Sequence, residues 1–380
     1  MRPKLFVAGM VLVVVAVIVG VDPRPVRAGE PPSASGYKVL DPIRHGSLTV
    51  FPVVAPKSFP TGEFITLDEG LRSGDVVVTE YGHLNGLLRR PPTPHPSAAV
   101  NQLVLVNNSK HPLLLLAGEI VAGGHQDRVI GKDRIVPPES DPVDLSVFCV
   151  EPGRWTGVSE RFGTSGALYG SKGADGSTRV PAASTLMAQP SVRAKAMDKD
   201  QNQVWAEVRK QQQSMAVEVE ASSPPAVPEP IHSTTSYAVV MENKDVKEKV
   251  DEVAKPIEQN YQSLIKQLRD RKAVGVVVAV NGRIIWTDIF ASTELLEKYW
   301  PKLVRSYASE AVVSRAKGAE ATVAQAEAFL ADMDGRKETI ESEPGVYRHT
   351  EVNGDGFKAF ALTSLLPKTG FDVHVAKMAE

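Results

Sequence analysis

The sequence predicts an α+β protein, with a β-rich N-terminal half that contains hairpins, followed by long amphipathic helices and a second set of strands. Three observations predict this class. Short apolar runs separated by Gly, Pro and Asn turns fill residues 37–156, which is typical of strands and hairpins. Apolar residues then recur every three or four positions over residues 246–268, as they do on one face of a helix. Runs rich in valine and isoleucine return from residue 274.

The first 28 residues have the pattern of a secretory signal peptide. Arg2 and Lys4 precede an uninterrupted apolar run, residues 5–21, and small residues lead to an expected cleavage point after Ala28. The run is slightly shorter than the about 20 residues that a membrane-spanning helix needs. The mature chain is therefore expected in the periplasm or outside the cell. An uncleaved anchor is the alternative, and it would be the only contact with a membrane.

Length and composition bound the domain organisation and the partners. The 380 residues allow about two or three domains, and a hydrophobic content of 42% can fill real cores. We expect a β-rich core at residues 37–156, a Gly- and Ser-rich loop segment at 157–200, and an α+β region at 201–377 that packs with the first. The net charge of −2 gives no basic excess, so we expect no nucleic-acid partner. The single cysteine excludes an intramolecular disulfide.

In the first half, short strands are expected between turns, with one short helix. The helix covers residues 67–74 and has Asp68 and Glu69 in its first turn. The expected strands are residues 48–54, 76–80, 103–106, 113–122, 133–136 and 143–150. The last of these should lie in the same sheet as the strands before it, because sequential strands usually pair or lie side by side.

A glycine pair, Gly123-Gly124, stands between two apolar segments and indicates a tight hairpin turn, because glycine adopts positive φ without a Cβ clash. In that register Glu119 would face Arg128, and Gln126 would share their face of the sheet. Glu119 and Arg128 would then form either an ordinary exposed pair, which contributes about 0.2–1 kcal/mol, or a partly buried pair that orients a ligand.

The second half begins with helices and ends with strands. Helices are expected at residues 199–219, 246–268 and 319–333, with another capped by Ser292 or Thr293. Pro256 should kink the second helix, and Pro301 should kink the capped helix or open a new one. Asn281-Gly282 is a hairpin turn between two strands. The expected strands are residues 274–280, 283–290, 347–350, 357–364 and 371–377.

Five polar residues of the central stretch are the candidate ligand-binding site. They combine carboxylates, an amide and guanidinium groups, and they are Glu119, Gln126, Arg128, Glu151 and Arg154. Because the planar fork of arginine suits phosphate and carboxylate groups, the expected ligand is a small anion. Two carboxylates can also act as acid and base where their surroundings separate their pKa values. The same residues could instead be structural ion pairs at strand ends.

Other chemistry has less support in the sequence. Cys149 lies in an apolar run and is expected to be a small buried hydrophobe, although His125 or His111 could activate it as a nucleophile. The eight histidines are scattered without the spacing of metal ligands. We therefore expect no metal and no cofactor.

The central stretch also carries a family resemblance. It contains the segments AGEIVAGGHQDRVIGKDRIVPP and VDLSVFCVEPGRW, and it is followed by SERFGTSGALYGSKG, DQNQVWAEV, VGVVVAVNGRIIWTDIF and KLVRSYASEA. Together these segments resemble the ADP-ribosylglycohydrolase- and rhodanese-phosphatase-superfamily-associated domain family over about residues 37–377. His125 and Asp127 depart from the lysine and asparagine that are common at these positions in the family. The resemblance implies no established activity and hints at nucleotide-like or phosphorylated ligands.

Two classes of function follow. The favoured one is an exported ligand-binding or interaction module for an anionic or nucleotide-like ligand. The alternative is a hydrolase of a small phosphorylated or ADP-ribose-like substrate, with Glu119 or Glu151 as acid or base. Binding is favoured because no catalytic constellation is complete in the sequence. Convergence of the five candidate residues in one concave pocket would favour the enzyme.

Overall fold

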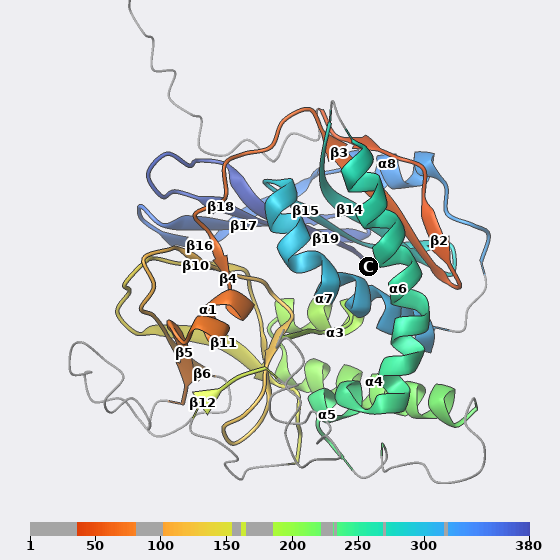
Figure 1. The fold of residues 1–380 in the computed structure, drawn as a ribbon, viewed down its shortest axis with the longest axis horizontal. Coiled ribbons are helices and arrows are strands. Elements are labelled where there is room, and N and C mark those ends of the chain that lie inside the picture. The colour runs from red at the N-terminus through yellow and green to blue at the C-terminus, as the bar shows by residue number, and fades with distance from the viewer. Residues whose placement is uncertain are drawn as a thin grey trace, which may run out of the picture. The chain divides into compact units, whose positions relative to one another are not determined.

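A nine-stranded sheet joins the two ends of the chain (Figure 1). Its strand order is β1-β3-β14-β15-β19-β18-β17-β16, and β2 also pairs with β3. The strands are β1 (Lys38–Val39), β2 (Ile43–His45), β3 (Leu48–Ala55), β14 (Lys272–Val280), β15 (Arg283–Phe290), β16 (Gly335–Glu343), β17 (Tyr347–Gly354), β18 (Phe357–Ser364) and β19 (Asp372–Ala379). All pairs in this sheet are antiparallel, and β3 pairs with β14 over nearly its full length.

This computed structural model describes residues 36–80, 102–153, 161–164, 185–221, 231, 234–268, 271–314 and 318–380. The segment Ala34–Glu380 forms one compact unit. The predicted signal peptide, Arg154 and most of the Gly- and Ser-rich segment lie outside the described residues. Within the described parts, no helix combines the length and the apolar character needed to cross a bilayer.

The central stretch forms two further sheets. A three-stranded sheet has the order β10-β7-β4, and a seven-stranded sheet has the order β12-β5-β6-β11-β9-β8-β13. Their strands are β4 (Ile65–Thr66), β5 (Val76–Thr79), β6 (Gln102–Asn107), β7 (Leu113–Leu115), β8 (Glu119–Val121), β9 (Arg128–Ile130), β10 (Arg134–Val136), β11 (Val143–Cys149), β12 (Arg161–Phe162) and β13 (Leu186–Met187). The prediction that the last strand of this half joins its predecessors in one sheet is confirmed, because β11 pairs with β6 and β9.

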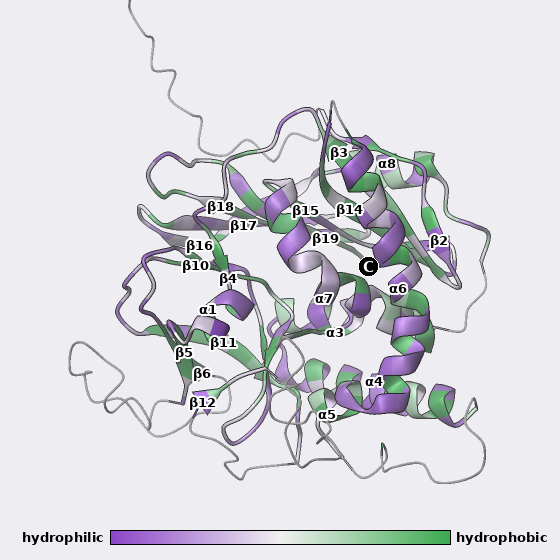
Figure 2. Cartoon of the chain, viewed as in Figure 1, coloured by the Kyte–Doolittle hydropathy of each residue, from purple (hydrophilic) through white to green (hydrophobic). Residues whose placement is uncertain are grey.

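The described helices are α1 (Leu67–Ser73), α3 (Pro190–Met197), α4 (Gln201–Glu220), α5 (Tyr237–Glu242), α6 (Lys244–Gln267), α7 (Thr293–Val313) and α8 (Val323–Ala331). Of these, α6 and α7 pack on one face of the nine-stranded sheet and α8 packs on the other, while α1 contacts β4, β5 and β7. Alternate strand residues divide between two cores, so Val276 packs with α6 and α7 while Val277 packs with α8. Figure 2 shows hydrophilic residues on the outer faces of α4 and α6. The predicted α+β class is therefore confirmed.

Local signals explain several of these elements. Thr66 and Glu69 form a capping box at the start of α1, and Ser292 caps α7. Asn281 and Gly282, with φ of 49° and 82°, make the predicted two-residue turn between β14 and β15. Pro256 and Pro301 both lie inside single helices, α6 and α7. The sequence patterns did not identify α3, α5 or β16.

The predicted strand at residues 113–122 is wrong in its extent. It divides into β7 and β8, which belong to different sheets. Gly118 lies between them with φ of 97°, a conformation that glycine adopts readily because it has no Cβ. An added Cβ there would also lie 2.4 Å from Cγ of Arg193. The backbone therefore turns at Gly118, and the continuous apolar run hides this turn.

The predicted tight turn at Gly123-Gly124 is also wrong. In the ladder between β8 and β9, Val121 lies opposite Arg128, so residues 122–127 form a wider loop. Glu119 consequently does not face Arg128. We call residues 122–127, with the carboxylates that bind their backbone, the acid loop.

Three carboxylates accept hydrogen bonds from the backbone N–H groups of the acid loop. The N–H of Gly123 donates to Asp127 Oδ1 at 3.0 Å, and the N–H of His125 donates to Glu80 Oε1 at 2.9 Å. The N–H of Asp127 donates to Glu151 Oε2 at 3.2 Å. A two-residue turn would satisfy its amides within the hairpin, whereas this loop uses its own Asp127 together with Glu80 and Glu151, which follow β5 and β11.

Candidate functional site

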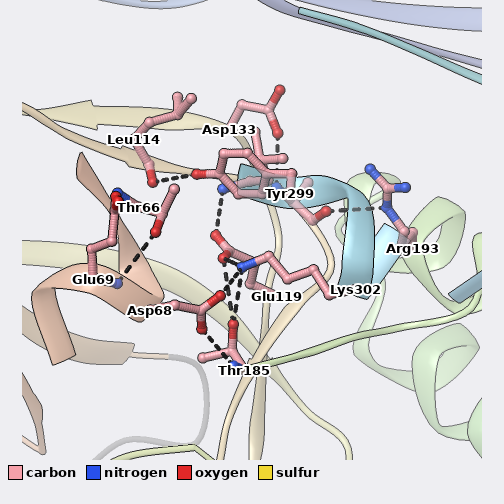
Figure 3. Close-up of polar contacts among 12 residues, drawn as sticks. Thr66, Asp68, Glu69, Leu114, Glu119, Asp133, Thr185, Arg193, Tyr299 and Lys302 are labelled. Atoms are coloured by element: carbon pink, nitrogen blue, oxygen red, sulfur yellow. Dashed lines mark hydrogen bonds and ion pairs between the residues drawn. The ribbon is translucent and has the colours of Figure 1, made fainter. Parts of the chain in front are cut away.

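Glu119 belongs to a buried group that we call the lysine cluster, made of Lys302, Glu119, Asp68 and Thr185 (Figure 3). Lys302 Nζ, on α7, donates to Asp68 Oδ2 at 2.8 Å and to Thr185 Oγ1 at 3.2 Å. It also donates to Glu119 Oε1. The other carboxylate oxygen of Glu119 accepts from the backbone N–H of Leu116 at 2.7 Å. The cluster therefore joins α7 to α1, β8 and the residue before β13.

The electrostatics of the lysine cluster are those of a closed group. Burial raises the pKa of the Glu119 carboxyl above its ordinary value, although Lys302 opposes that shift. Burial alone would lower the pKa of Lys302, but Asp68 and Glu119 raise it overall. All three N–H donors of the lysine have acceptors. This closed arrangement favours a structural role for Glu119.

A second buried group, the arginine cluster, contains Arg193, Asp288, His374, Asp133 and Tyr307. Arg193 Nη1 and Nη2 donate to the two oxygens of Asp288 at 2.9 and 3.0 Å, a bidentate pair. His374 Nδ1 lies 2.6 Å from Asp133 Oδ2, and its Nε2 lies 3.2 Å from Asp288 Oδ1. The hydroxyl of Tyr307 donates to Asp288 Oδ2.

Charge in the arginine cluster is balanced. Burial alone would lower the pKa of His374, but Asp133 and Asp288 raise it to about 9. Both ring nitrogens then carry protons at neutral pH, as their two carboxylate partners require. Burial alone would raise the pKa of Asp288, yet Arg193 and His374 hold it well below its usual range. Two cations thus face two carboxylates, and the group links α3, α7, β15 and β19 without exposure to solvent.

Sequence reasoning missed both clusters, although one signal was available. Asp288 and His374 stand within apolar strand patterns, and a charged group in a buried strand has to be paired. The identity of the partners was not accessible, because Arg193 and Asp133 lie on elements distant in the sequence.

The acid loop brings together two of the predicted site residues. Gln126 and Glu151 are both 6% exposed. Gln126 Nε2 donates to the backbone oxygen of Glu151 at 3.0 Å, and the same Glu151 accepts from Asp127 N–H. His125 Nδ1 pairs with Glu80. Ser236, the N-cap of α5, donates to Asp127 Oδ2 at 2.8 Å.

One acceptor of the acid loop has no hydrogen-bond partner. Gln126 Oε1 is buried and unpaired, in contrast to its amide nitrogen. The orientation of this amide is fixed by its contact, because the backbone oxygen of Glu151 can only accept a hydrogen bond. The atom that remains is therefore a carbonyl oxygen that needs a donor, and buried acceptors without donors call for an explanation.

Of the five predicted residues, the structure describes Glu119, Gln126, Arg128 and Glu151, and these four do not converge. Val121, Arg128 and Cys149 lie opposite one another in adjacent strands. Glu119 lies two residues before this row and Glu151 two residues after it, which separates them by roughly 13 Å along the strand direction. Glu119 and the acid loop are therefore at different ends of these strands.

The remaining candidates are placed as follows. Arg128 is fully buried, and its Nη1 lies 3.4 Å from the backbone oxygen of Asp127. Cys149 is buried, and burial raises the pKa of its thiol, which opposes a role as nucleophile. Across the part of the chain that the structure describes, no three His, Cys, Asp or Glu side chains are grouped so as to hold a metal ion.

Comparison with known proteins identifies the family of the chain but provides no activity. No curated protein and no solved structure matches the chain. A family model, the ARG and Rhodanese-Phosphatase-superfamily-associated Protein domain, matches residues 36–377. That range includes both buried clusters, the acid loop and all of the three sheets except the last two residues of β19. The chain therefore belongs to the ARG and Rhodanese-Phosphatase-superfamily-associated Protein domain family.

Proposed function

We propose that the protein is an exported ligand-binding module and that the acid loop is its ligand site. The observation that carries the proposal is the buried, unpaired Oε1 of Gln126 beside the backbone-bound carboxylate of Glu151. A donor on a ligand would satisfy this oxygen. In a folded protein, leaving such a group unpaired costs about 1–3 kcal/mol. Gln211 Oε1 is unpaired too, and Gln126 is distinguished by its place among the carboxylates of the acid loop.

The groups at this site favour one end of a nucleotide-like ligand. Gln126 Oε1 is an acceptor, and the nearby carboxylates of Glu80 and Glu151 are acceptors too. Ribose hydroxyls and exocyclic amines are donors, and carboxylates commonly bind ribose hydroxyls in nucleotide sites. We assign the anionic end of the ligand to Arg154, whose planar fork suits phosphate. The ligand class thus remains anionic and nucleotide-like, with its donor end at Gln126.

Hydrolysis has less support than binding. The two proposed acids, Glu119 and Glu151, lie roughly 13 Å apart along the strands, whereas paired catalytic carboxylates are commonly about 5–9.5 Å apart in enzymes such as glycosidases. Glu119 is also closed off by Lys302. Glu151 would have to act with a different partner, so we place the hydrolase second.

The test is isothermal titration calorimetry of the purified protein with ADP-ribose, AMP, adenosine and inorganic phosphate. We expect ADP-ribose or AMP to bind, and we expect Gln126→Leu to weaken that affinity about threefold to tenfold, the value of one neutral hydrogen bond. The matched control is Gln211→Leu. Gln211 is also buried with an unpaired Oε1, but it contacts Ser191 and Glu207.

Three results would count against the proposal. Equal binding by parent and Gln126→Leu would remove the acid loop as the site. An equal loss in Gln211→Leu would show a general effect on the fold. Binding of inorganic phosphate alone, unaffected by Gln126→Leu, would support an anion site elsewhere. Release of products during the titration would instead move the hydrolase to first place.

A further inference from the structure

At one end of the nine-stranded sheet, the exposed ring of Phe59 stacks on the ring of Phe371, which is half-buried against the core. Phe59 and Phe371 have centroids 4.5 Å apart and planes inclined by 17°. Phe59 is 50% exposed, and among the described large hydrophobic side chains only Val217 is also classed as exposed. We call residues 57–59 and 368–371 the aromatic tip.

The exposure of the aromatic tip is built into the backbone. Phe59 N–H donates to the backbone oxygen of Ala291 at 2.8 Å, next to the start of α7. On the other loop, Ser364 N–H donates to the oxygen of Phe371 at 3.0 Å, and Gly370 N–H donates to the oxygen of Ser364 at 3.0 Å. These backbone bonds fix the two loops, so Phe59 stays exposed on top of the half-buried Phe371.

Positive charge accompanies the rings. Lys57 and Lys368 are exposed and stand two and three residues before Phe59 and Phe371. Neither lysine forms an ion pair with any residue that the structure describes. Glu63 is the exposed acid nearest in sequence to Phe59. Lysines beside exposed aromatic rings are typical of segments that meet a membrane interface, where the amine contacts lipid phosphate and the ring enters the headgroup region.

The first described residue of the chain lies next to the aromatic tip. Gly36, the first described residue, lies against Pro56, and an added Cβ on Gly36 would be 3.8 Å from Cδ of that ring. Pro56 is three residues before Phe59. The described part of the chain therefore begins next to the aromatic tip.

We propose that the aromatic tip docks on an anionic membrane surface. Lys57 and Lys368 contact lipid phosphates, and Phe59 and Phe371 enter the interface. Each lysine near such a surface adds to the electrostatic attraction, so two lysines and the Phe59 ring give reversible contact. Single-stranded nucleic acid also binds aromatic rings flanked by lysines, but the net charge of −2 and the expected export favour the membrane. This proposal and the proposed ligand site both assume that the protein is exported, but they rest on different residues.

The test places an environment-sensitive fluorophore on the tip of the full chain. Ser58→Cys is exposed, and the native Cys149 is buried and will not compete for the label. The reference position is Asp355→Cys, which lies at the opposite end of β18, roughly 25 Å away. Both labelled proteins are mixed with vesicles of phosphatidylcholine, with or without phosphatidylglycerol. We expect a blue shift of the emission at Ser58→Cys, only with phosphatidylglycerol, and no shift at Asp355→Cys.

Variants separate the tip from the N-terminal apolar run, which they leave intact. Lys57→Glu combined with Lys368→Glu should abolish the shift, and Phe59→Ser should reduce it. Lys110→Glu, another exposed lysine without an ion pair to a described residue, should leave it unchanged. An absent shift at Ser58→Cys, or equal shifts at both labelled positions, would overturn the proposal. So would a shift with single-stranded DNA and none with vesicles.

Discussion

At the scale of single residues, buried charges are arranged in closed groups whose cations and carboxylates satisfy each other. Lys302 in one cluster and Arg193 in the other each bind carboxylates from distant elements. Removing one member of such a buried group costs about 3–5 kcal/mol, because the partner is left charged and unpaired. Glu119 is therefore explained by the fold, whereas the unpaired oxygen of Gln126 is not.

The arginine cluster predicts a pH dependence of stability. His374 has a folded pKa of about 9 against an ordinary value of 6.5, so its contribution is fully present below pH 6.5 and is lost as pH rises through 9. Stability should fall between pH 6.5 and 8 by at most about 1.4 kcal/mol per pH unit. This window avoids His349, whose pKa is lowered by burial, and largely avoids Lys377, whose pKa is lowered to about 8.

The measurement is urea unfolding at several pH values in that window. His374→Gln should be less stable than the parent but should lack its decline, whereas His45→Gln, at an exposed position, should keep the decline. If His374→Gln does not fold, NMR titration of the His374 ring in the parent gives the pKa directly. A ring pKa near 6.5, or an unchanged slope in His374→Gln, would contradict the assigned charge state.

At the scale of elements, the two hairpin glycines of the nine-stranded sheet predict different sensitivities. Gly282 has φ of 82° and an added Cβ would lie 1.7 Å from the backbone oxygen of Ala319. Gly356 has φ of 70° and open space around it. Gly356→Ala should cost about 1–2 kcal/mol from backbone strain alone. Gly282→Ala should cost clearly more, since its neighbour is backbone and must move.

Urea unfolding of the two variants provides the comparison, with the parent as reference. The difference between them isolates the contact with Ala319, because both share the left-handed conformation. Equal losses of unfolding free energy would mean that the backbone around residue 319 moves aside without a measurable penalty. A smaller loss in Gly282→Ala would contradict the close contact with Ala319.

Two predicted hairpin turns, Asn281-Gly282 and Gly123-Gly124, show what the sequence can predict in this fold. The Asn281-Gly282 turn was predictable because its residues alone satisfy its geometry. The Gly123-Gly124 turn was not, because Glu80 and Glu151 bind the loop amides from distant strands. For the same reason the site could be predicted only in part: Gln126 and Glu151 meet, while Glu119 is drawn to Lys302 on α7, a residue far along the chain.

At the scale of the whole molecule, the N- and C-terminal parts of the chain share one sheet. β3 pairs with β14, and α7 contributes to both buried clusters while it packs against the sheet. The acid loop and the aromatic tip are parts of this one unit, Ala34–Glu380. A change in either cluster should therefore lower the global stability, whereas the exposed lysines of the aromatic tip can be varied without that loss.

The last prediction concerns the N-terminal segment, on which export and both binding proposals depend. Cleavage after Ala28 should give a mature chain that begins at Gly29, because small residues occupy the positions that a signal peptidase reads. N-terminal sequencing of protein from the producing cell, with fractionation of soluble and membrane material, measures this. Replacing Ala28 by leucine should block processing and leave the protein with the membrane, whereas Lys38→Ala, beyond the site, should be processed normally. A mature chain that still begins at Met1 would establish the anchored alternative, in which residues 5–21 stay in the membrane and the protein is not released.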